Sequence, residues 1–291
     1  MPMRSDALRD AESQPPFPHE RYESAVGALA PQYQANSPVP HLYFTDFLDE
    51  DVAHVLAAEF PDHDDESWIQ YKHINENKSG KDKRDELPEL IGRVIDELNS
   101  PRFVAFLRRL TGIADLIADP AIEGGGMHQA QTGGFLNVHT DFTTHRQQPT
   151  WRRRCNLILY LNEGWEEAWG GNLEFWSSDM RRCVASLPPL LNRAVIFNTP
   201  GALHGYPDPL RCPEGHARKS VQLYYYTVDA APDEVPHATT YHARPKDGRL
   251  KRVLIRLDNK MLEVYAWLKR RLGISDASVS WILRKLGRKK H

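Results

Sequence analysis

Near Gly124 the hydrophobic pattern of this 291-residue chain changes from helical spacing to short alternating runs. The glycines at 124–126 and 133–134 bound the first of these runs. The runs lie at about 127–131, 134–141, 154–161, 171–176, 193–198 and 218–227. Short strands separated by turn residues are typical of a closed or double-sheet all-β core, and they argue against a parallel α/β sheet. We therefore predict a closed or double-sheet β-core over residues 124–230.

Alternation within these runs separates a polar face from an apolar face. In the run 154–161 the odd positions are all apolar, and the polar groups stand at even positions, among them Asn156 and Tyr160. In the run 218–227 one face carries Arg218, Ser220, Gln222, Tyr224 and Tyr226. Successive side chains of a strand point to opposite faces. We therefore expect a small barrel with a cavity lined by polar groups, and other elements covering its apolar outer face.

The residues before this core divide into two parts. Residues 1–38 are rich in Pro, Ser, Gln and Ala without clear periodicity, and we interpret them as a flexible N-terminal arm. Residues 39–123 show mostly helical spacing, interrupted by a polar stretch at 75–86. We interpret this part as a helical support region packed outside the core, so the expected fold class is α+β.

Residues 231–291 are predicted to form a linker and a basic amphipathic helical tail. From Lys246 to His291 there are 14 Lys and Arg against 4 Asp and Glu, a net charge of +10. Apolar residues recur there at spacings of three or four, at Leu250, Leu254, Leu257, Met261, Val264, Leu268 and Leu272. We expect this stripe to pack on the acidic body or on a second copy, because a continuous apolar stripe usually buries itself. The alternative is that the tail binds an anionic partner.

Composition excludes several classes of protein. No run approaches the about 18 apolar residues of a membrane-spanning helix, and the start of the chain shows no secretory signal. The three cysteines contain no CxxC pair, which argues against a disulfide scaffold and a cysteine-rich zinc site. We therefore expect a cytoplasmic protein without a membrane span. A nucleic-acid partner is disfavoured, since no recognisable nucleic-acid module is present.

The strongest chemical signal is His139-Thr140-Asp141 at the end of the run FLNVHTD. Residues i and i+2 of a strand point to the same side, so the imidazole and the carboxylate converge. His204 follows another strand-like run and is the candidate third ligand. Two histidines and one carboxylate leave open positions that suit Fe(II) with a chelating co-substrate and O₂. A single HxD pair is also a common surface pattern.

A second signal stands fourteen residues after His204, where Arg218 and Ser220 open a strand on one face. A guanidinium fork and a hydroxyl on the same side are suited to gripping a carboxylate. Tyr160, on the polar face of its run, is a further candidate for that carboxylate or a simple barrel-filling aromatic. His128 and His145 are weaker candidates for lining a substrate entrance.

Together these motifs make the chain resemble the Fe(II)/2-oxoglutarate-dependent dioxygenase superfamily, in its prolyl-hydroxylase-like branch. The resemblance rests on HTD, RRRCNLILYLN, GGNLEFW and GALHGYPDPLRCPEGHARKS, and it covers residues from about 124 to 228. It implies a double-stranded β-helix core, with iron held by His139, Asp141 and His204. It also implies that Arg218 binds the 5-carboxylate of 2-oxoglutarate, with Ser220 completing the RxS pattern.

The same resemblance implies the reaction. Tyr160 matches a family tyrosine that reaches 2-oxoglutarate, and Asn156 lies on the same face. The expected cofactors are Fe(II), 2-oxoglutarate as co-substrate and O₂, with ascorbate as an additional reductant. The expected products are succinate, CO₂ and a hydroxylated prime substrate. Family members that halogenate lack the carboxylate of the HxD pair, so the presence of Asp141 favours hydroxylation.

The residues leave the prime substrate open. A small molecule, a peptidyl residue, a lipid and a saccharide all remain candidates, and arginines in the loop 142–153 suggest an acidic or phosphorylated one. A homo-oligomer through the C-terminal helix is also open. The main alternative from another class is a non-catalytic cupin-like protein that binds a metal or a ligand. Such a protein needs no carboxylate clamp, so Arg218 and Ser220 argue against it.

Overall fold

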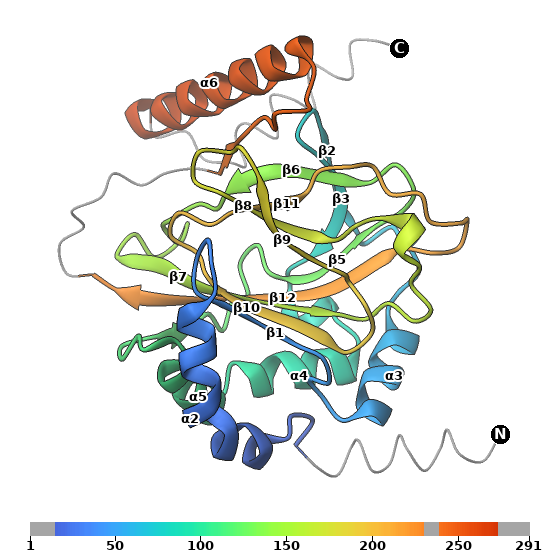
Figure 1. The fold of residues 1–291 in the computed structure, drawn as a ribbon, viewed down its shortest axis with the longest axis vertical. Helices are drawn as coiled ribbons and strands as arrows, with labels where there is room; N and C mark the ends of the chain where they lie inside the picture. Colours follow the sequence, from blue (N-terminus) through green and yellow to red (C-terminus); the bar gives the residue numbers. More distant parts are fainter. Residues whose placement is uncertain (1–14, 230–238, 273–291) are drawn as a thin grey trace.

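The computed structural model describes residues 15–229 and 239–272 of the chain. Strands pair in the order β1-β10-β7-β12-β5-β3-β6-β11-β8-β9, and β13, β2 and β4 pair with β6, β3 and β12. The named pairs are antiparallel. The sheet folds over into two facing layers that β3 joins, with α2 to α5 below one layer and α6 at the opposite end (Figure 1). This confirms the predicted double-stranded β-helix core with helices outside.

Before the core strands that begin with β5, the chain forms α2 (His19–Ala35), β1 (His41–Phe44), α3 (Glu50–Glu59), β2 (Ile69–His73), β3 (Glu76–Lys81), η1 (Arg84–Glu86), α4 (Glu89–Leu98), α5 (Pro101–Thr111) and β4 (Ile117–Ala118). The core continues with β5 (Gly126–Ala130), β6 (Phe135–Thr140), β7 (Trp151–Tyr160), η2 (Glu167–Trp169), β8 (Leu173–Trp176), β9 (Cys183–Leu187), β10 (Arg193–Asn198), β11 (Leu203–Tyr206) and β12 (Arg218–Val228). The chain then forms β13 (Thr240–Tyr241) and α6 (Arg249–Leu272).

The main hydrophobic core lies between the helices and the layer that contains β7 and β12. It includes the odd residues of β7 at Cys155, Leu157 and Leu159, together with Val221, Leu223 and Tyr225 of β12. Helices contribute buried residues such as Phe103 and Phe106. The predicted alternation is therefore confirmed for these strands. Because the apolar faces pack on helices, the opposite faces point into the barrel.

The N-terminal segment differs from the prediction of a flexible arm. Residues 19–35 form helix α2, although Pro31 lies inside it. The helix buries Tyr22, Val26 and Tyr33, and the hydroxyl of Tyr33 donates to the Asn198 side chain in β10. The hydrophobic spacing is too weak to predict this helix, because a few large aromatic side chains supply most of its packing. Residues 1–14 lie outside the described residues.

The region 39–123 is only partly helical. It holds α3, α4 and α5 as expected, but it also contributes β1, β2 and β3 to the sheet. The polar stretch that we read as an interruption includes β3, which pairs with both β5 and β6. Its inward residues line a polar cavity, so a run such as ENKSGK lacks the apolar alternation that usually marks a strand.

Helix α6 is present as predicted, but the described part of its apolar stripe, from Leu250 to Met261, is only partly covered by the body. Leu250, Leu257 and Met261 are 72%, 53% and 69% exposed, whereas Ile255 is 2% exposed. The body instead holds the helix through polar contacts: Asp258 accepts from Asn75, and the Asn259 side chain bonds both backbone groups of Tyr241. The end of the predicted helical tail, residues 273–291, lies outside the described residues.

Candidate metal centre and co-substrate pocket

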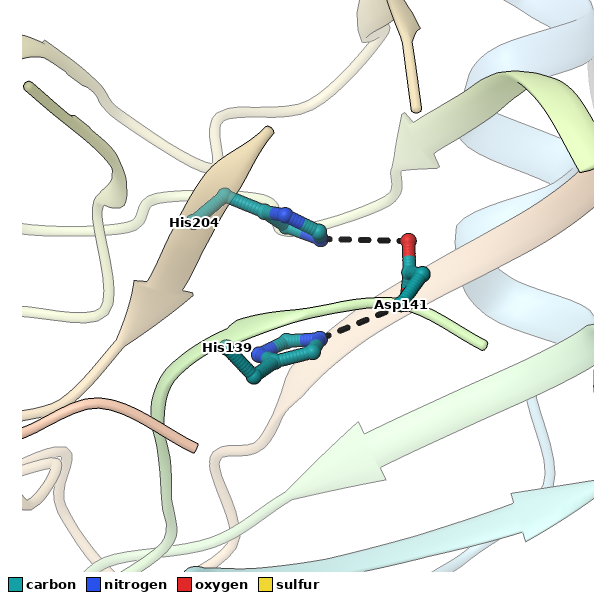
Figure 2. A group of neighbouring side chains, drawn as sticks. All are labelled: His139, Asp141 and His204. Atoms are coloured by element: carbon teal, nitrogen blue, oxygen red, sulfur yellow. Dashed lines mark ion pairs between the residues drawn. The ribbon is translucent and has the colours of Figure 1, made fainter. Parts of the chain in front are cut away.

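Three predicted ligands meet inside the barrel. His139 at the end of β6, Asp141 just after it and His204 of β11 place one ligand atom each within 4.8 Å of one another. Strand β11 pairs with β6 so that His204 stands directly opposite His139. Figure 2 shows both imidazoles directed at the Asp141 carboxylate, with Nε2–oxygen distances of 3.4 Å for His139 and 3.6 Å for His204. Within the described residues, this is the only such group of potential metal ligands.

Backbone carbonyls orient both imidazoles. Nδ1 of His139 donates to the carbonyl of Asn137 at 3.0 Å, and Nδ1 of His204 donates to that of Ala202 at 3.1 Å. Each Nε2 therefore presents its lone pair to the centre. Burial, together with neighbouring His139, lowers the pKa of His204 to about 4, so this imidazole is neutral at ordinary pH. A neutral imidazole is the form that binds a metal ion.

Arg153 and Asn156 of β7 hold the Asp141 carboxylate. Nη2 of Arg153 lies 3.1 Å from Asp141 Oδ2, and the Asn156 amide donates to the same oxygen at 2.8 Å. Burial alone would raise the pKa of Asp141, but Arg153 and the two imidazoles hold it well below its usual range. Asp141 is therefore an anion, and one oxygen is fixed by donors from the protein.

Arg218 lies buried at another wall of the same cavity. Its Nε donates to the Gly171 carbonyl at 2.7 Å and its Nη2 to the Tyr160 hydroxyl at 3.2 Å. The guanidinium also lies over the ring of Tyr206, 4.1 Å from its centroid. Arg218, His139, Asp141 and His204 all line one cavity of about 50 Å³. The structure thus brings the predicted carboxylate clamp and the predicted ligands together.

The contacts differ among the remaining predicted pocket residues, which are Tyr160, Ser220 and Asn156. Tyr160 contacts Arg218 directly, and burial raises the pKa of its phenol despite that guanidinium. Ser220 is fully buried and accepts a hydrogen bond from the Gln222 amide at 3.2 Å. The Asn156 side chain is engaged by Asp141 and Arg153, so the structure places it beside the ligands and away from Arg218.

Two cavity residues were not singled out from the sequence. Arg153 was grouped with exposed loop arginines, but its side chain is 2% exposed. Lys78 of β3 lines the cavity and pairs with Glu76 at 3.3 Å. Burial lowers the pKa of Lys78, yet the Glu76 carboxylate outweighs this and the net pKa is raised, so the ammonium is charged. A strand reading of residues 76–81 would have put Lys78 and Glu76 on one face.

The other histidines are not placed as entrance residues. His145 is 4% exposed and lies 3.3 Å from Asp119 and 3.4 Å from Glu123, so it is a buried structural group. His128 of β5 is 7% exposed, and its Nε2 donates to the carbonyl of Gly125. His216 packs against Trp169 and does not belong to the ligand cluster.

The donor set fits Fe(II). Two imidazole nitrogens and one carboxylate converge from two paired strands, and each imidazole is oriented by a second hydrogen bond. Such a set occupies part of a metal's coordination sphere and leaves positions for a chelating co-substrate and O₂. Arg218 supplies a buried cation in the same cavity for the far end of an anionic co-substrate.

Residues 125–226 match the sequence model of the 2OG-Fe(II) oxygenase superfamily. The match covers 102 of the 291 residues, and this part of the chain has the sequence pattern of the superfamily. The matched segment begins beside β5 and ends in β12, so it contains all three ligands and Arg218. The oxygenase therefore uses Fe(II), 2-oxoglutarate and O₂. No curated protein matches the chain at a significant level.

Solved structures share the fold of the oxygenase. A prolyl hydroxylase from Trichoplax adhaerens, solved with a peptide fragment of the hypoxia inducible factor oxygen degradation domain, is 16% identical. That match covers 72% of this chain and 91% of the other, with a TM-score of 0.51. A Pseudomonas putida prolyl-4-hydroxylase is 18% identical over 71% of this chain and 100% of its own, with a TM-score of 0.49. Among the described residues, no helix is long and apolar enough to cross a membrane.

Proposed function

We propose that the oxygenase hydroxylates an unactivated C–H bond of a prime substrate, with His139, Asp141 and His204 as iron ligands and Arg218 as the anchor of 2-oxoglutarate. The observation that supports this most directly is the position of the ligand cluster and the buried guanidinium in one cavity. When bound, iron and its co-substrates supply the oxidising chemistry that yields succinate, CO₂ and an oxygen atom for the substrate.

The protein's own residues bind and orient the reactants. Arg218 presents its guanidinium to an anionic co-substrate, and Tyr160 and the Gly171 carbonyl fix the direction of that group. Arg153 and Asn156 keep Asp141 ionised and restrict its rotation. We propose that Ser220 adds a hydroxyl at the far end of the co-substrate, on the same strand face as Arg218. The barrel wall, including Phe175 and Phe197 around His204, excludes water from the ligands.

The presence of Asp141 supports hydroxylation. A carboxylate ligand there fills the position that chloride takes in halogenating members of the superfamily. Hydroxylase relatives share the fold, and the prolyl hydroxylase neighbours make a peptidyl residue one candidate for the prime substrate. A small molecule and a saccharide are the other candidates. The match to an oxygenase family argues against the alternative of a non-catalytic cupin-like binding protein.

Two finer proposals concern the setting of the enzyme. The exposed apolar residues of α6 support a homo-oligomer through this helix, which light scattering of the full chain tests directly. The three free cysteines support work in a reducing compartment such as the cytoplasm. Nucleic acid remains disfavoured as a partner, and heparin retention at graded salt is the check.

Succinate formation from 2-oxoglutarate tests the function. Purified protein with Fe(II) and ascorbate is expected to form succinate, and His139→Ala or Asp141→Ala is expected to abolish it because a ligand is lost. Arg218→Ala is the matched contrast: it retains the ligands and is expected to raise the KM for 2-oxoglutarate at least tenfold, through loss of a charge-assisted contact. Full succinate formation by Asp141→Ala would contradict the assignment of Asp141 as an iron ligand.

A further inference from the structure

A second polar groove lies outside the cavity of the metal centre. It runs between β13, the first turns of α6 and the turn between β8 and β9, and has a volume of about 510 Å³. Tyr241 lines this groove, and its ring lies 5.8 Å from the ring of His139. The residues that matter below are Arg181, Arg244, Arg252, Arg256, His242 and Asp179. None of them lies within the family-matched core except Arg181 and Asp179.

Positive charge dominates the lining. Among the groove's described residues, four are arginines and only one, Asp179, is acidic. Asp179 pairs with Arg181 at 3.5 Å, so it does not neutralise the arginines of α6. Arg256 is exposed and forms no ion pair with another described residue. A concave surface with clustered guanidinium groups attracts anions.

Arg244 gives the groove a buried donor that the protein leaves unused. The residue is 3% exposed, and its Nη2 contacts Asp208 at 2.9 Å, Asp247 at 3.3 Å and the carbonyl of Pro207 at 3.4 Å. Its Nε and Nη1 are buried and have no hydrogen-bond partner. A buried donor without a partner is destabilising, because the loss of its hydrogen bonds to water is not compensated. Two such donors on one guanidinium therefore indicate a place for an external acceptor.

Helix α6 adds two guanidinium groups at fixed positions. Arg252 and Arg256 are one turn apart and line the groove together with Ile255 and Asn259 of the same face. Arg252 is held by the carbonyls of Asp247 and Pro245. The bonds from Asn259 to Tyr241 tie this face to β13. The arginines thus stand on a face that the body anchors.

We propose that this groove is a binding site for an oxyanion, the phosphate or carboxylate group of a small molecule. Arg244 supplies a charge from the buried side of the groove, and Arg256 supplies a free charge on its open side. Arg252 lines the same face. A ligand held there is separated from the metal ligand His139 by the side chain of Tyr241. The site stands on its own residues and is independent of the oxygenase reaction.

Calorimetric titration of the metal-free full chain with inorganic phosphate, and separately with acetate, tests the proposal. Wild type is expected to bind at least one of the two anions. Arg256→Gln is expected to bind it roughly tenfold more weakly, the loss of one charged hydrogen bond. Arg244→Gln is expected to lose more, but it also removes contacts to Asp208 and Asp247, so Arg256→Gln is the decisive variant. Arg249→Gln, an exposed arginine of α6 outside the groove, is the matched control and is expected to bind as wild type.

The co-substrate pocket also attracts anions, so Arg218→Gln separates the two sites. Retention of phosphate or acetate binding in Arg218→Gln, with loss in Arg256→Gln, supports the groove. A higher affinity for phosphate identifies a phosphorylated ligand, and a higher affinity for acetate identifies a carboxylate. Binding that disappears in Arg218→Gln and is unchanged in Arg256→Gln overturns the proposal, as does no binding of either anion. Succinate formation by Arg256→Gln is expected to equal wild type, so failure of the oxygenase assay leaves this result intact.

Discussion

Arg153 shows how a buried charge is made tolerable in the barrel. Its guanidinium pairs with Asp141, donates to the side-chain amide oxygen of Asn156 and lies 3.4 Å from the centroid of the Tyr224 ring. An unpaired buried guanidinium would be strongly destabilising, but here the anion and the aromatic face compensate it. The same pair keeps Asp141 ionised. One side chain therefore serves both the stability of the cavity and the charge of the metal ligand.

His128 is a buried imidazole of the opposite kind, without a charge partner. Burial, with the nearby Lys78 ammonium, lowers its pKa from 6.5 to about 3, and its Nδ1 has no hydrogen-bond partner. Between about pH 6.5 and 3 the unfolded chain therefore binds a proton that the folded chain refuses. By linkage, the free energy of unfolding falls as the pH is lowered through this window, by about 1.4 kcal/mol per pH unit from this group.

We expect His128→Gln to flatten this acid dependence. The glutamine amide can still donate to the Gly125 carbonyl, but it binds no proton in either state. Urea unfolding of the metal-free protein from pH 7 to pH 4 measures the slope. Parallel curves for wild type and His128→Gln would contradict the buried neutral imidazole.

At the scale of elements, the turn before β8 positions a residue of β12. Gly171 has φ +81°, and its carbonyl accepts from Arg218 Nε. A Cβ at Gly171 would lie 2.7 Å from a methyl of Leu210 and 3.0 Å from Arg218 Cδ. The glycine therefore permits both the backbone conformation and the close approach of the guanidinium. The GGNLEFW segment thus contributes a backbone carbonyl as well as the side chain of Leu173 to the co-substrate pocket.

Gly171→Ala is expected to displace Arg218 and raise the KM for 2-oxoglutarate several-fold, with little change in iron affinity. Gly170→Ala provides a matched control, since Gly170 also has positive φ, +73°, but a Cβ there meets nothing within 4 Å. Both variants carry the backbone strain, and only one carries the clash. Steady-state succinate formation with varied 2-oxoglutarate distinguishes them, and an equal KM in the two variants would disprove the role of the turn.

At the scale of the whole molecule, the C-terminal unit closes the barrel beside the metal centre. Strand β13 pairs with β6 so that Tyr241 stands opposite His139, and α6 clamps that strand through Asn259 (Figure 1). Asn75 in the β2–β3 turn joins the same unit through Asp258. Residues beyond the family-matched segment 125–226 therefore pack against the predicted metal ligand His139.

Asn259→Ala is expected to lower the free energy of unfolding by about 1–3 kcal/mol, because two backbone groups of Tyr241 lose their partner. We also expect weaker binding of Co(II), used as a stable stand-in for Fe(II), since β13 no longer holds β6 at His139. Lys260→Ala, the exposed neighbour on α6, is the control for helix stability. Calorimetry and denaturant unfolding read out the two effects, and unchanged Co(II) affinity in Asn259→Ala would show that the clamp does not reach the metal centre.

The local pattern was enough to predict the strands of the core and the residues at its centre. His139 and Asp141 stand two residues apart on one strand, and Arg218 and Ser220 do the same, so their common direction follows from strand geometry alone. The alternation of β7 and β12 likewise predicted which residues pack on the helices. These features depend on neighbours in sequence, which is why the sequence by itself determined them.

Only the tertiary structure decided the rest of the site. Simple alternation puts Arg153 on the apolar side of β7 with Cys155, but the register shifts between Tyr225 and Tyr226 of β12, and Arg153 turns into the cavity. Such an irregularity reverses the faces of a strand and leaves no local signal. Lys78 of β3 lines the cavity of the metal ligands, although β3 is distant from them in sequence. Arg244, which follows β13, and Arg256 of α6 line the same groove. Pairings of this kind depend on the packing of the whole chain, and sequence spacing does not encode them in any one segment.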